Sequence, residues 1–263
     1  MGVFCYNPHI MSWAQRRKAT YTLGFFVIIA VIAFFILFSL FNKKATCFDG
    51  IQNQGETGID CGGPCTILCR ADYVDPTVLW VRSTKVLSSG TYSILAYATN
   101  ANVGAGAYNV PYTFKIYDQN NILLYSGSGS TYVPPANDFA VFIDSININD
   151  KVPARIDFTF GSGYTWQKMD NTDAGIKLVS QQLTNTDTAP KLFATLQNTT
   201  LVPIKNIESI AILYDANNNA IAFSRTITDS INPNATANIV FTWPEVFSGT
   251  VYKIDIVSKS IPQ

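Results

Sequence analysis

Two similar stretches of sequence decide the fold: residues 114–121 are FKIYDQNN, and residues 211–218 are AILYDANN. The two stretches lie 97 positions apart, and other landmarks keep nearly the same offset, such as Asn100 and Asn198 at 98 positions. A similarity preserved along the chain indicates two tandem units rather than one large domain.

Alternation of apolar and polar residues predicts that both units are made of β-strands. Residues 155–160, RIDFTF, place apolar side chains at every second position, and residues 252–256, YKIDI, do the same. Turns rich in Asn and Pro separate such runs, and no amphipathic helix of useful length interrupts them. We therefore expect an all-β region of two sandwiches, residues 76–169 and 175–260, each able to fold alone. Between them, residues 170–175 predict a linker too polar to bury.

The strand that ends in Tyr-Asp and leads into a polar turn resembles the FxLYD-type β-sandwich domain of bacterial envelope proteins. The first copy has Ile116 where Leu is usual, and the second has Ala211 in place of Phe. The resemblance covers most of residues 76–258 but depends on this short motif. It implies an immunoglobulin-like fold in a membrane-anchored protein, with no catalytic residues to carry over.

An uncharged segment, residues 19–42, precedes the β region, and residues 21–41 within it are almost continuously apolar. As a helix, such a run extends about 31 Å, which matches the hydrocarbon thickness of a bilayer. A cleaved signal peptide has a shorter apolar region that ends in small residues, whereas this run leads into Asn42-Lys43-Lys44. We predict a transmembrane helix in the lipid bilayer, behind a cytoplasmic tail of residues 1–18.

Four cysteines follow within residues 47–69: Cys47, Cys61, Cys65 and Cys69. This segment has little apolar content, so it needs covalent or metal cross-links to fold. Four cysteines allow three disulfide pairings, and zinc is the competing interpretation, although the spacing is not that of two C-x-x-C knuckles. We predict two disulfides in a module of residues 45–72. Disulfides imply an oxidising compartment, and hence a position outside the cytoplasm.

Asp49, Asn53, Glu56 and Asp60 lie between the first two cysteines and offer the hard oxygen ligands that calcium prefers. Their spacing is not that of an EF-hand, and solvated turn residues are the alternative to a structural calcium site. The segment also resembles a motif of bacterial surface proteins, C-x-D-G-x-x-N-x-x-E-T-x-x-D-C-G-G-x-C-x-x-C, with one extra residue before Cys69. The resemblance implies a spacer or stalk element.

The charge distribution argues against a nucleic-acid partner. All 18 acidic residues lie beyond residue 44, where they outnumber the 13 Lys and Arg. Phosphate binding requires a cationic patch instead. The one histidine, His9, precedes the apolar segment, which excludes histidine-based triads and histidine metal sites from the region after it. We expect no enzymatic activity and no cofactor other than the calcium considered above.

We predict a single-pass protein of the bacterial cytoplasmic membrane, N-terminus inside, that presents two sandwiches outside for protein interaction or envelope scaffolding. Its partners would be other envelope or surface proteins. The alternative is an adhesin or receptor whose distal sandwich binds glycan or another surface ligand. Trp80, Trp166 and Trp243 form either a glycan-stacking surface or part of the cores. Exposed aromatic loops would favour the adhesin, and a large flat apolar face would favour the scaffold.

Overall fold

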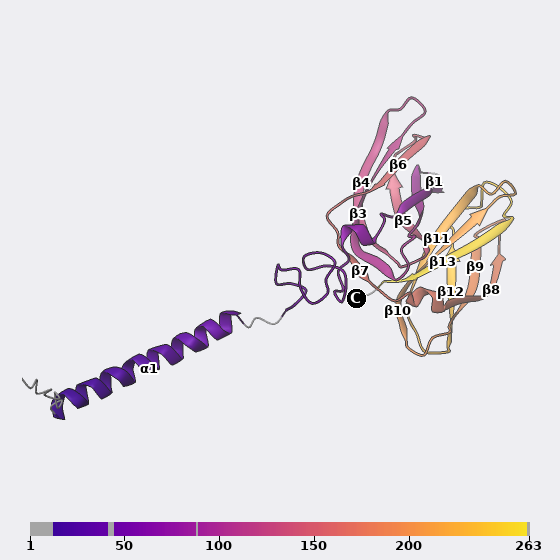
Figure 1. Ribbon diagram of the computed structural model, residues 1–263. Helices are drawn as coiled ribbons and strands as arrows, with labels where there is room; N and C mark the ends of the chain where they lie inside the picture. The colour runs from indigo at the N-terminus through magenta and orange to yellow at the C-terminus, as the bar shows by residue number, and fades with distance from the viewer. Residues whose placement is uncertain (1–12, 42–44, 88, 262–263) are drawn as a thin grey trace, which may run out of the picture.

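The computed structural model describes residues 13–41, 45–87 and 89–261. Within them the protein is mostly β, with one helix followed by thirteen strands and two short 3-10 segments (Figure 1). Cys5, His9, Lys43 and Lys44 lie outside the described residues, as does most of the predicted cytoplasmic tail.

The helix α1, Trp13–Phe41, is long and apolar enough to cross a membrane, as an anchor or as a signal sequence. Its most apolar window is not buried against any described part of the chain. The hydroxyls of Thr20 and Thr22 donate to the carbonyls of Arg16 and Lys18, both at 2.9 Å, so the helix satisfies them itself. It begins before the predicted residue 19 because the preceding residues are mostly good helix formers.

The cysteine-rich module consists of turns, bends and isolated β-bridges up to the 3-10 segment η1, Arg70–Asp72. Two disulfides close it: Cys47 is bonded to Cys65 and Cys61 to Cys69, with Cα–Cα distances of 5.7 and 5.1 Å. The structure thus selects the interleaved pairing from the three that the sequence allows. Because all four sulfurs are in disulfides, no thiolate of this group is left to bind zinc.

The first half of the β region is a pair of antiparallel sheets, here called the first sheet pair. One sheet has the order β1-β2-β5 and the other β4-β3-β6, with the short β7 also paired to β3. Ile94 and Phe139 of one sheet share a core with Phe114 and Phe158 of the other. The alternation predicted in residues 155–160 is confirmed, since Phe158 is buried between exposed neighbours. The strands are β1 Thr77–Leu87, β2 Thr91–Thr99, β3 Ala105–Tyr117, β4 Leu123–Val133, β5 Asp138–Asn147, β6 Arg155–Phe160 and β7 Trp166–Lys168.

The second half is built in the same way, and we call it the second sheet pair. Its sheets have the orders β12-β9-β8 and β11-β10-β13, and Leu196 and Phe241 of one share a core with Leu213 of the other. The last strand begins one residue later than its sequence pattern predicts, and the ring of Tyr252 before it is exposed. The strands are β8 Ile176–Thr184, β9 Lys191–Asn198, β10 Ile204–Tyr214, β11 Ala220–Ile231, β12 Thr236–Thr242 and β13 Lys253–Ser260.

The Tyr-Asp turn has the same structure in both halves. Oδ1 of Asp118 accepts the backbone N–H groups two and four residues later, and Oδ1 of Asp215 does the same, at 2.8–2.9 Å. Asn121 and Asn218 take positive φ angles of 60° and 59°, a conformation that Asn tolerates better than most residues. These contacts explain why Asp and Asn occur at these positions of both copies.

Asn100 and Asn198 are buried at equivalent corners of the two sheet pairs. Each side-chain amide donates to two backbone carbonyls, at 2.6–2.9 Å. Each Oδ1 accepts the backbone N–H two residues further on. The offset of 98 residues therefore relates two copies of one hydrogen-bonded corner.

A third apolar core lies between the two sheet pairs. Leu95 and Ala140 of the first pair pack with Ile210, Ile212 and Phe223 of the second, and all five are buried. The sheet β1-β2-β5 thus faces the sheet β11-β10-β13 across this core (Figure 1). The central strands β2 and β10 are covered on both faces, which explains their nearly continuous burial.

The segment between the sheet pairs is not the unburied polar linker that its composition predicts. It forms the 3-10 segment η2, Thr172–Gly175, in which Asp173 is buried. The expectation is wrong because Oδ1 of Asp173 finds a backbone donor far along the chain, the N–H of Ser260 at 2.7 Å. A hydrogen bond of this kind lowers the cost of burying a carboxylate.

Candidate functional site between the two sheet pairs

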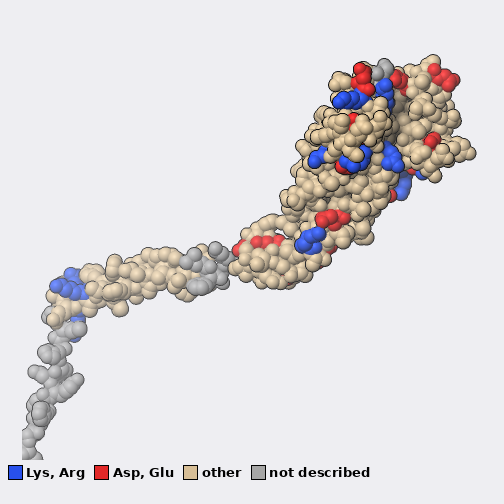
Figure 2. Space-filling model, turned by 90° about the horizontal axis from the view of Figure 1, so that it is seen from above, with Lys and Arg blue, Asp and Glu red and all other residues tan. Residues whose placement is uncertain are grey.

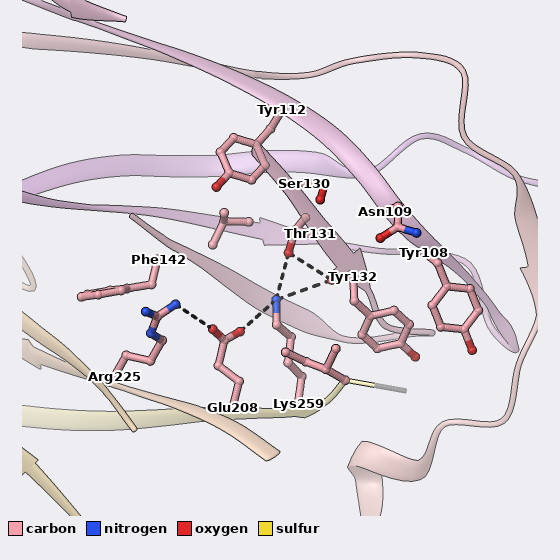
Figure 3. A pocket seen from close by; sticks show the side chains of 12 residues that line it. Tyr108, Asn109, Tyr112, Ser130, Thr131, Tyr132, Phe142, Glu208, Arg225 and Lys259 are labelled. Carbon is pink, nitrogen blue, oxygen red and sulfur yellow. Dashed lines mark hydrogen bonds and ion pairs between the residues drawn. The ribbon is translucent and has the colours of Figure 1, made fainter. Parts of the chain in front are cut away.

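A row of charged side chains ends the apolar core between the sheet pairs. Glu208 precedes Ile210 on β10 by two residues, so strand alternation turns both side chains to the same face. In the sheet register, Glu208 lies opposite Lys259 of β13, and Ile210 lies opposite Arg225 of β11. Three neighbouring strands therefore place Arg225, Glu208 and Lys259 side by side (Figure 3).

Lys259 is 4% exposed, and its ammonium group reaches from the second sheet pair into the first. Nζ donates to Thr131 Oγ1 at 3.1 Å and to the carbonyls of Ala140 and Tyr132 at 3.2 and 3.5 Å, and it lies 3.3 Å from Glu208 Oε2. Burial lowers the pKa of Lys259, and the carboxylate of Glu208 acts to raise it. A buried ammonium group is stable only with such partners, so these contacts favour one relative placement of the sheet pairs.

Glu208 also joins Lys259 to Arg225. Nη1 of Arg225 lies 3.4 Å from Oε1 of Glu208, while Lys259 contacts the other carboxylate oxygen. The guanidinium carbon lies 5.2 Å from the ring centroid of Phe142, which belongs to β5 of the first sheet pair. This cation–π contact is a second polar link across the junction.

Asp173 is a further buried acidic group near this row. Burial raises the pKa of its carboxyl from 3.8 to about 6, against the opposing effects of the Ser260 N–H and the Lys259 charge. Within the described residues, its Oδ2 has no hydrogen-bond partner. Among the described residues of this row, Glu208 is thus ion-paired to two cations, and the nearby Asp173 carboxyl has a pKa raised to about 6.

The charged row lines a pocket of about 760 Å³ (Figure 3). Tyr108, Tyr112 and Tyr132 of the first sheet pair line it too, and the rings of Tyr108 and Tyr132 are stacked with centroids 5.4 Å apart. Burial raises the pKa of Tyr112 and of Tyr132, so both keep their hydroxyl protons at neutral pH. Aromatic faces together with hydroxyl and charged groups suit a small polar ligand, such as a sugar.

The four predicted calcium ligands lie in the cysteine module, where they organise the backbone. The carboxylate of Asp60 accepts the N–H groups of Asp49 and Gly50, and Oε2 of Glu56 accepts that of Asp60. Asp49 accepts an N–H of the Asn53 side-chain amide at 3.0 Å. These are the contacts of turn residues, and calcium binding at these positions remains a prediction. Glu56 also lies near the sulfurs of one disulfide, which are not metal-binding thiolates.

The tryptophans of the β region pack inside it. Trp166 is buried in the first core, and Nε1 of the buried Trp243 donates to the carbonyl of Phe223. Trp80 stacks on Tyr97 beside the core between the sheet pairs. The core interpretation is therefore confirmed for Trp166 and Trp243, and Trp80 is half-buried against the core between the sheet pairs.

Sequence reasoning missed the row formed by Arg225, Glu208 and Lys259. A signal was present in residues 204–214, IKNIESIAILY, where Glu208 interrupts a run of apolar residues too continuous for a strand with one wet face. A charged residue inside such a strand needs a charged partner. The sequence did not say which of the distant cations would be that partner.

No protein-family model matches this chain, and a comparison with curated proteins finds no match. Among solved structures, the chain is similar to a transglutaminase of red sea bream, at 11% identity over 70% of this chain and 29% of that chain, with a TM-score of 0.23. A putative beta-galactosidase from Bacteroides fragilis gives 11% identity, coverage of 68% and 34%, and a TM-score of 0.19. The chain thus spans only a minor part of either protein, and likenesses at these scores carry no argument about fold or function.

Proposed function

We propose that this chain is a non-enzymatic, single-pass membrane protein that holds a rigid body outside the cytoplasmic membrane for protein interaction or scaffolding in a bacterial envelope. In this proposal the sheet pairs, residues 76–169 and 175–260, are tandem immunoglobulin-like sandwiches of the FxLYD type. The helix α1 is the anchor, and the cysteine module is a spacer. The Tyr-Asp turn and the buried Asn corner, each present twice, support the tandem assignment.

The observation that carries the proposal is the apolar core between the sheet pairs, closed by the buried Lys259. Interfaces between domains of one chain are usually polar enough to permit relative motion. Here five buried apolar side chains, together with the hydrogen bonds from the buried Lys259 to Thr131 and Ala140, join the two halves. A body of this kind keeps its outer surfaces at fixed spacing, which suits a scaffold better than a hinged pair of domains would.

One outer face offers a contact surface for a protein partner. Phe193 of β9 and Val240 of β12 are cross-strand neighbours, and 46% and 40% of their surfaces are exposed. The exposed outer face of the first sheet pair, on β3, instead carries the polar residues Thr113 and Lys115. Apolar side chains that meet on an otherwise polar surface are typical of interaction sites.

A photo-cross-linking amino acid at position 193 tests this use of the surface in intact cells. The proposal predicts a discrete protein adduct from position 193 and none from the control position 115. If the two positions give the same adducts or neither gives any, the proposed contact surface is wrong.

The charge around α1 and the disulfides both support the N-inside orientation. Figure 2 shows Lys and Arg gathered at one end of the helix, where Arg16, Arg17 and Lys18 lie, with no charge along the rest of its described length. Positive residues favour the cytoplasmic side, and disulfides favour the exported side. Protease added to spheroplasts should digest an epitope at Gln263 and spare one at Met1; the reverse result would overturn the topology.

The pocket lined by tyrosines favours a second candidate, a receptor for glycan. Its aromatic residues lie between the sheet pairs, not at the distal turns of the second sandwich as the adhesin hypothesis expected. A glycan array probed with the full chain in detergent tests this function. Binding that is lost in Tyr108→Ala and kept in the control Tyr125→Ala would support it, and the absence of any glycan signal would argue against it.

A further inference from the structure

We propose that the cysteine module lies on the membrane and inserts Phe48, Ile51 and Ile59 into the headgroup region of the outer leaflet. The inference rests on the anchoring proposed for α1. It goes further by assigning a lipid-binding surface to a segment that would otherwise be only a spacer.

Every large apolar side chain in residues 47–63, cysteines apart, is exposed. The exposed fractions are 79% for Phe48, 61% for Ile51 and 63% for Ile59. The later part of the module behaves in the usual way, because Ile67 and Leu68 are half-buried and Leu68 packs against the core of the first sheet pair. Three exposed apolar side chains in one short segment indicate a contact that covers them.

Hydrogen bonds to the Asp60 carboxylate bring the three apolar residues into the same region of the module. The carboxylate of Asp60 accepts the backbone N–H of Asp49 at 3.0 Å and that of Gly50 at 2.9 Å. Phe48 and Ile51 flank the two donors in sequence, and Ile59 directly precedes the acceptor. Cys47 and Cys61 lie next to these residues in sequence. Their disulfides, Cys47–Cys65 and Cys61–Cys69, attach this hydrogen-bonded region to the rest of the module.

Chain connectivity identifies the bilayer as the partner. The helix ends at Phe41, and Phe48 follows seven positions later, a separation that a fully extended chain spans with about 25 Å at most. The headgroup region begins where the transmembrane helix leaves the hydrocarbon, so the module cannot lie far from it. Phe and Ile lower their free energy by entering this region, as apolar side chains of peripheral segments do.

Contact with lipid would orient the whole β region, because the module is fastened to the first sheet pair. The N–H of Leu68 donates to the carbonyl of Trp166 at 3.0 Å, and the N–H of Lys168 donates to the carbonyl of Thr66 at 2.8 Å. The ring of Tyr73 stacks on Trp166 with centroids 5.1 Å apart. A module held on the membrane surface therefore sets the tilt of the sheets.

Fluorescence quenching in nanodiscs tests the proposal with the full chain. A fluorescent amino acid is placed at position 48, 51 or 59, or at the exposed polar control positions Gln54 and Thr66 of the same module. The nanodiscs contain phosphatidylcholine and phosphatidylglycerol, with a nitroxide on part of the headgroups. We expect quenching several-fold stronger at positions 48, 51 and 59 than at the controls. Equal quenching at both sets of positions would overturn the inference.

Two further variants separate the outcomes. A probe at Phe34, inside the apolar part of α1, reports anchoring through quenching by nitroxides on the acyl chains. Failure of this quenching would contradict the membrane anchor and not only the inserted surface. With the probe at position 48, Ile51→Ser combined with Ile59→Ser should remove the excess quenching. If the quenching stays unchanged, the three side chains do not share one lipid-facing surface. Alkylation without reduction checks that both disulfides still form in each variant.

Discussion

Equivalent strands of the two sheet pairs differ in what covers their outer faces. On β3, Thr113 and Lys115 are exposed to solvent, whereas Ile210 and Ile212 at the equivalent positions of β10 are buried in the core between the sheet pairs. The features common to both copies, such as the Tyr-Asp turn, specify the fold of each unit. The positions at which the copies differ specify which face of each unit meets the other.

The copies also differ in side-chain size at one pair of facing core positions, and a change at the facing residue compensates for this difference. Phe114 lies opposite Gly127, where an added Cβ would come within 2.6 Å of the Phe114 ring. At the equivalent positions of the second copy, Ala211 lies opposite Ser224. A large residue facing glycine is thus replaced by two small residues, which keeps the volume between the strands similar. The Ala at the Phe position of the second motif is therefore consistent with intact packing.

Ile212→Lys should have the largest effect, because it gives the second copy the residue found at the equivalent position of the first. The change puts an unpaired charge into the shared core, and we expect the free energy of unfolding to fall by about 4–5 kcal/mol. Denaturant unfolding of the purified protein measures the loss. The reciprocal control, Lys115→Ile, lies on an exposed face and should change stability by no more than about 0.5 kcal/mol. Similar losses of unfolding free energy in both variants would contradict the claim that the β10 face is buried and the equivalent β3 face is exposed.

Lys259→Met should cost about 3–5 kcal/mol, since it removes the closest cation of the buried Glu208 and leaves only Arg225 paired with it. Adding Glu208→Gln to this variant should restore part of the loss, because it removes a buried carboxylate that only the partly exposed Arg225 still pairs. The control is Lys253→Met on the same strand, which breaks an exposed ion pair with Asp255 and should cost about 0–1 kcal/mol. If both lysine variants lose the same stability, Lys259 does not stabilise the contact between the sheet pairs.

Asp173→Asn should change the pH dependence of stability. Burial raises the pKa of Asp173 from 3.8 to about 6, so the folded protein holds this proton more tightly than the unfolded chain. The stabilisation from the protonated carboxyl is complete below about pH 4 and is lost as the pH rises to about 6. Relative to the variant, the natural protein should therefore lose up to about 3 kcal/mol across this window in urea unfolding. Parallel profiles would contradict the raised pKa.

The elements that depend on local pattern could be predicted from the sequence. Residues 155–160 form a strand because alternation alone specifies it, and the apolar helix follows from length and hydropathy. Burial of Asp173 could not be predicted in this way, because its backbone partner lies 87 residues away. The disulfide pairing likewise depends on how the loops of the module fold, which spacing does not determine.

The candidate site could not be predicted from the sequence for a different reason. Lys259 contacts residues of β4 and β5 across more than a hundred positions, and only the relative placement of the sheet pairs brings them together. The run around Glu208 nevertheless contained a usable signal. An apolar strand without alternation indicates cover on both faces, and therefore a partner for the second face.

The central claim is that the two sheet pairs form one cooperative body, and calorimetry of a core variant tests it most directly. Leu196→Ala leaves a cavity in the core of the second sheet pair, where Leu196 is 1% exposed, and should cost about 2–5 kcal/mol. The shared core predicts a single transition of the β region that moves as a whole to lower temperature. Two transitions, with one lowered and the other unmoved, would contradict the account and show two domains that unfold independently.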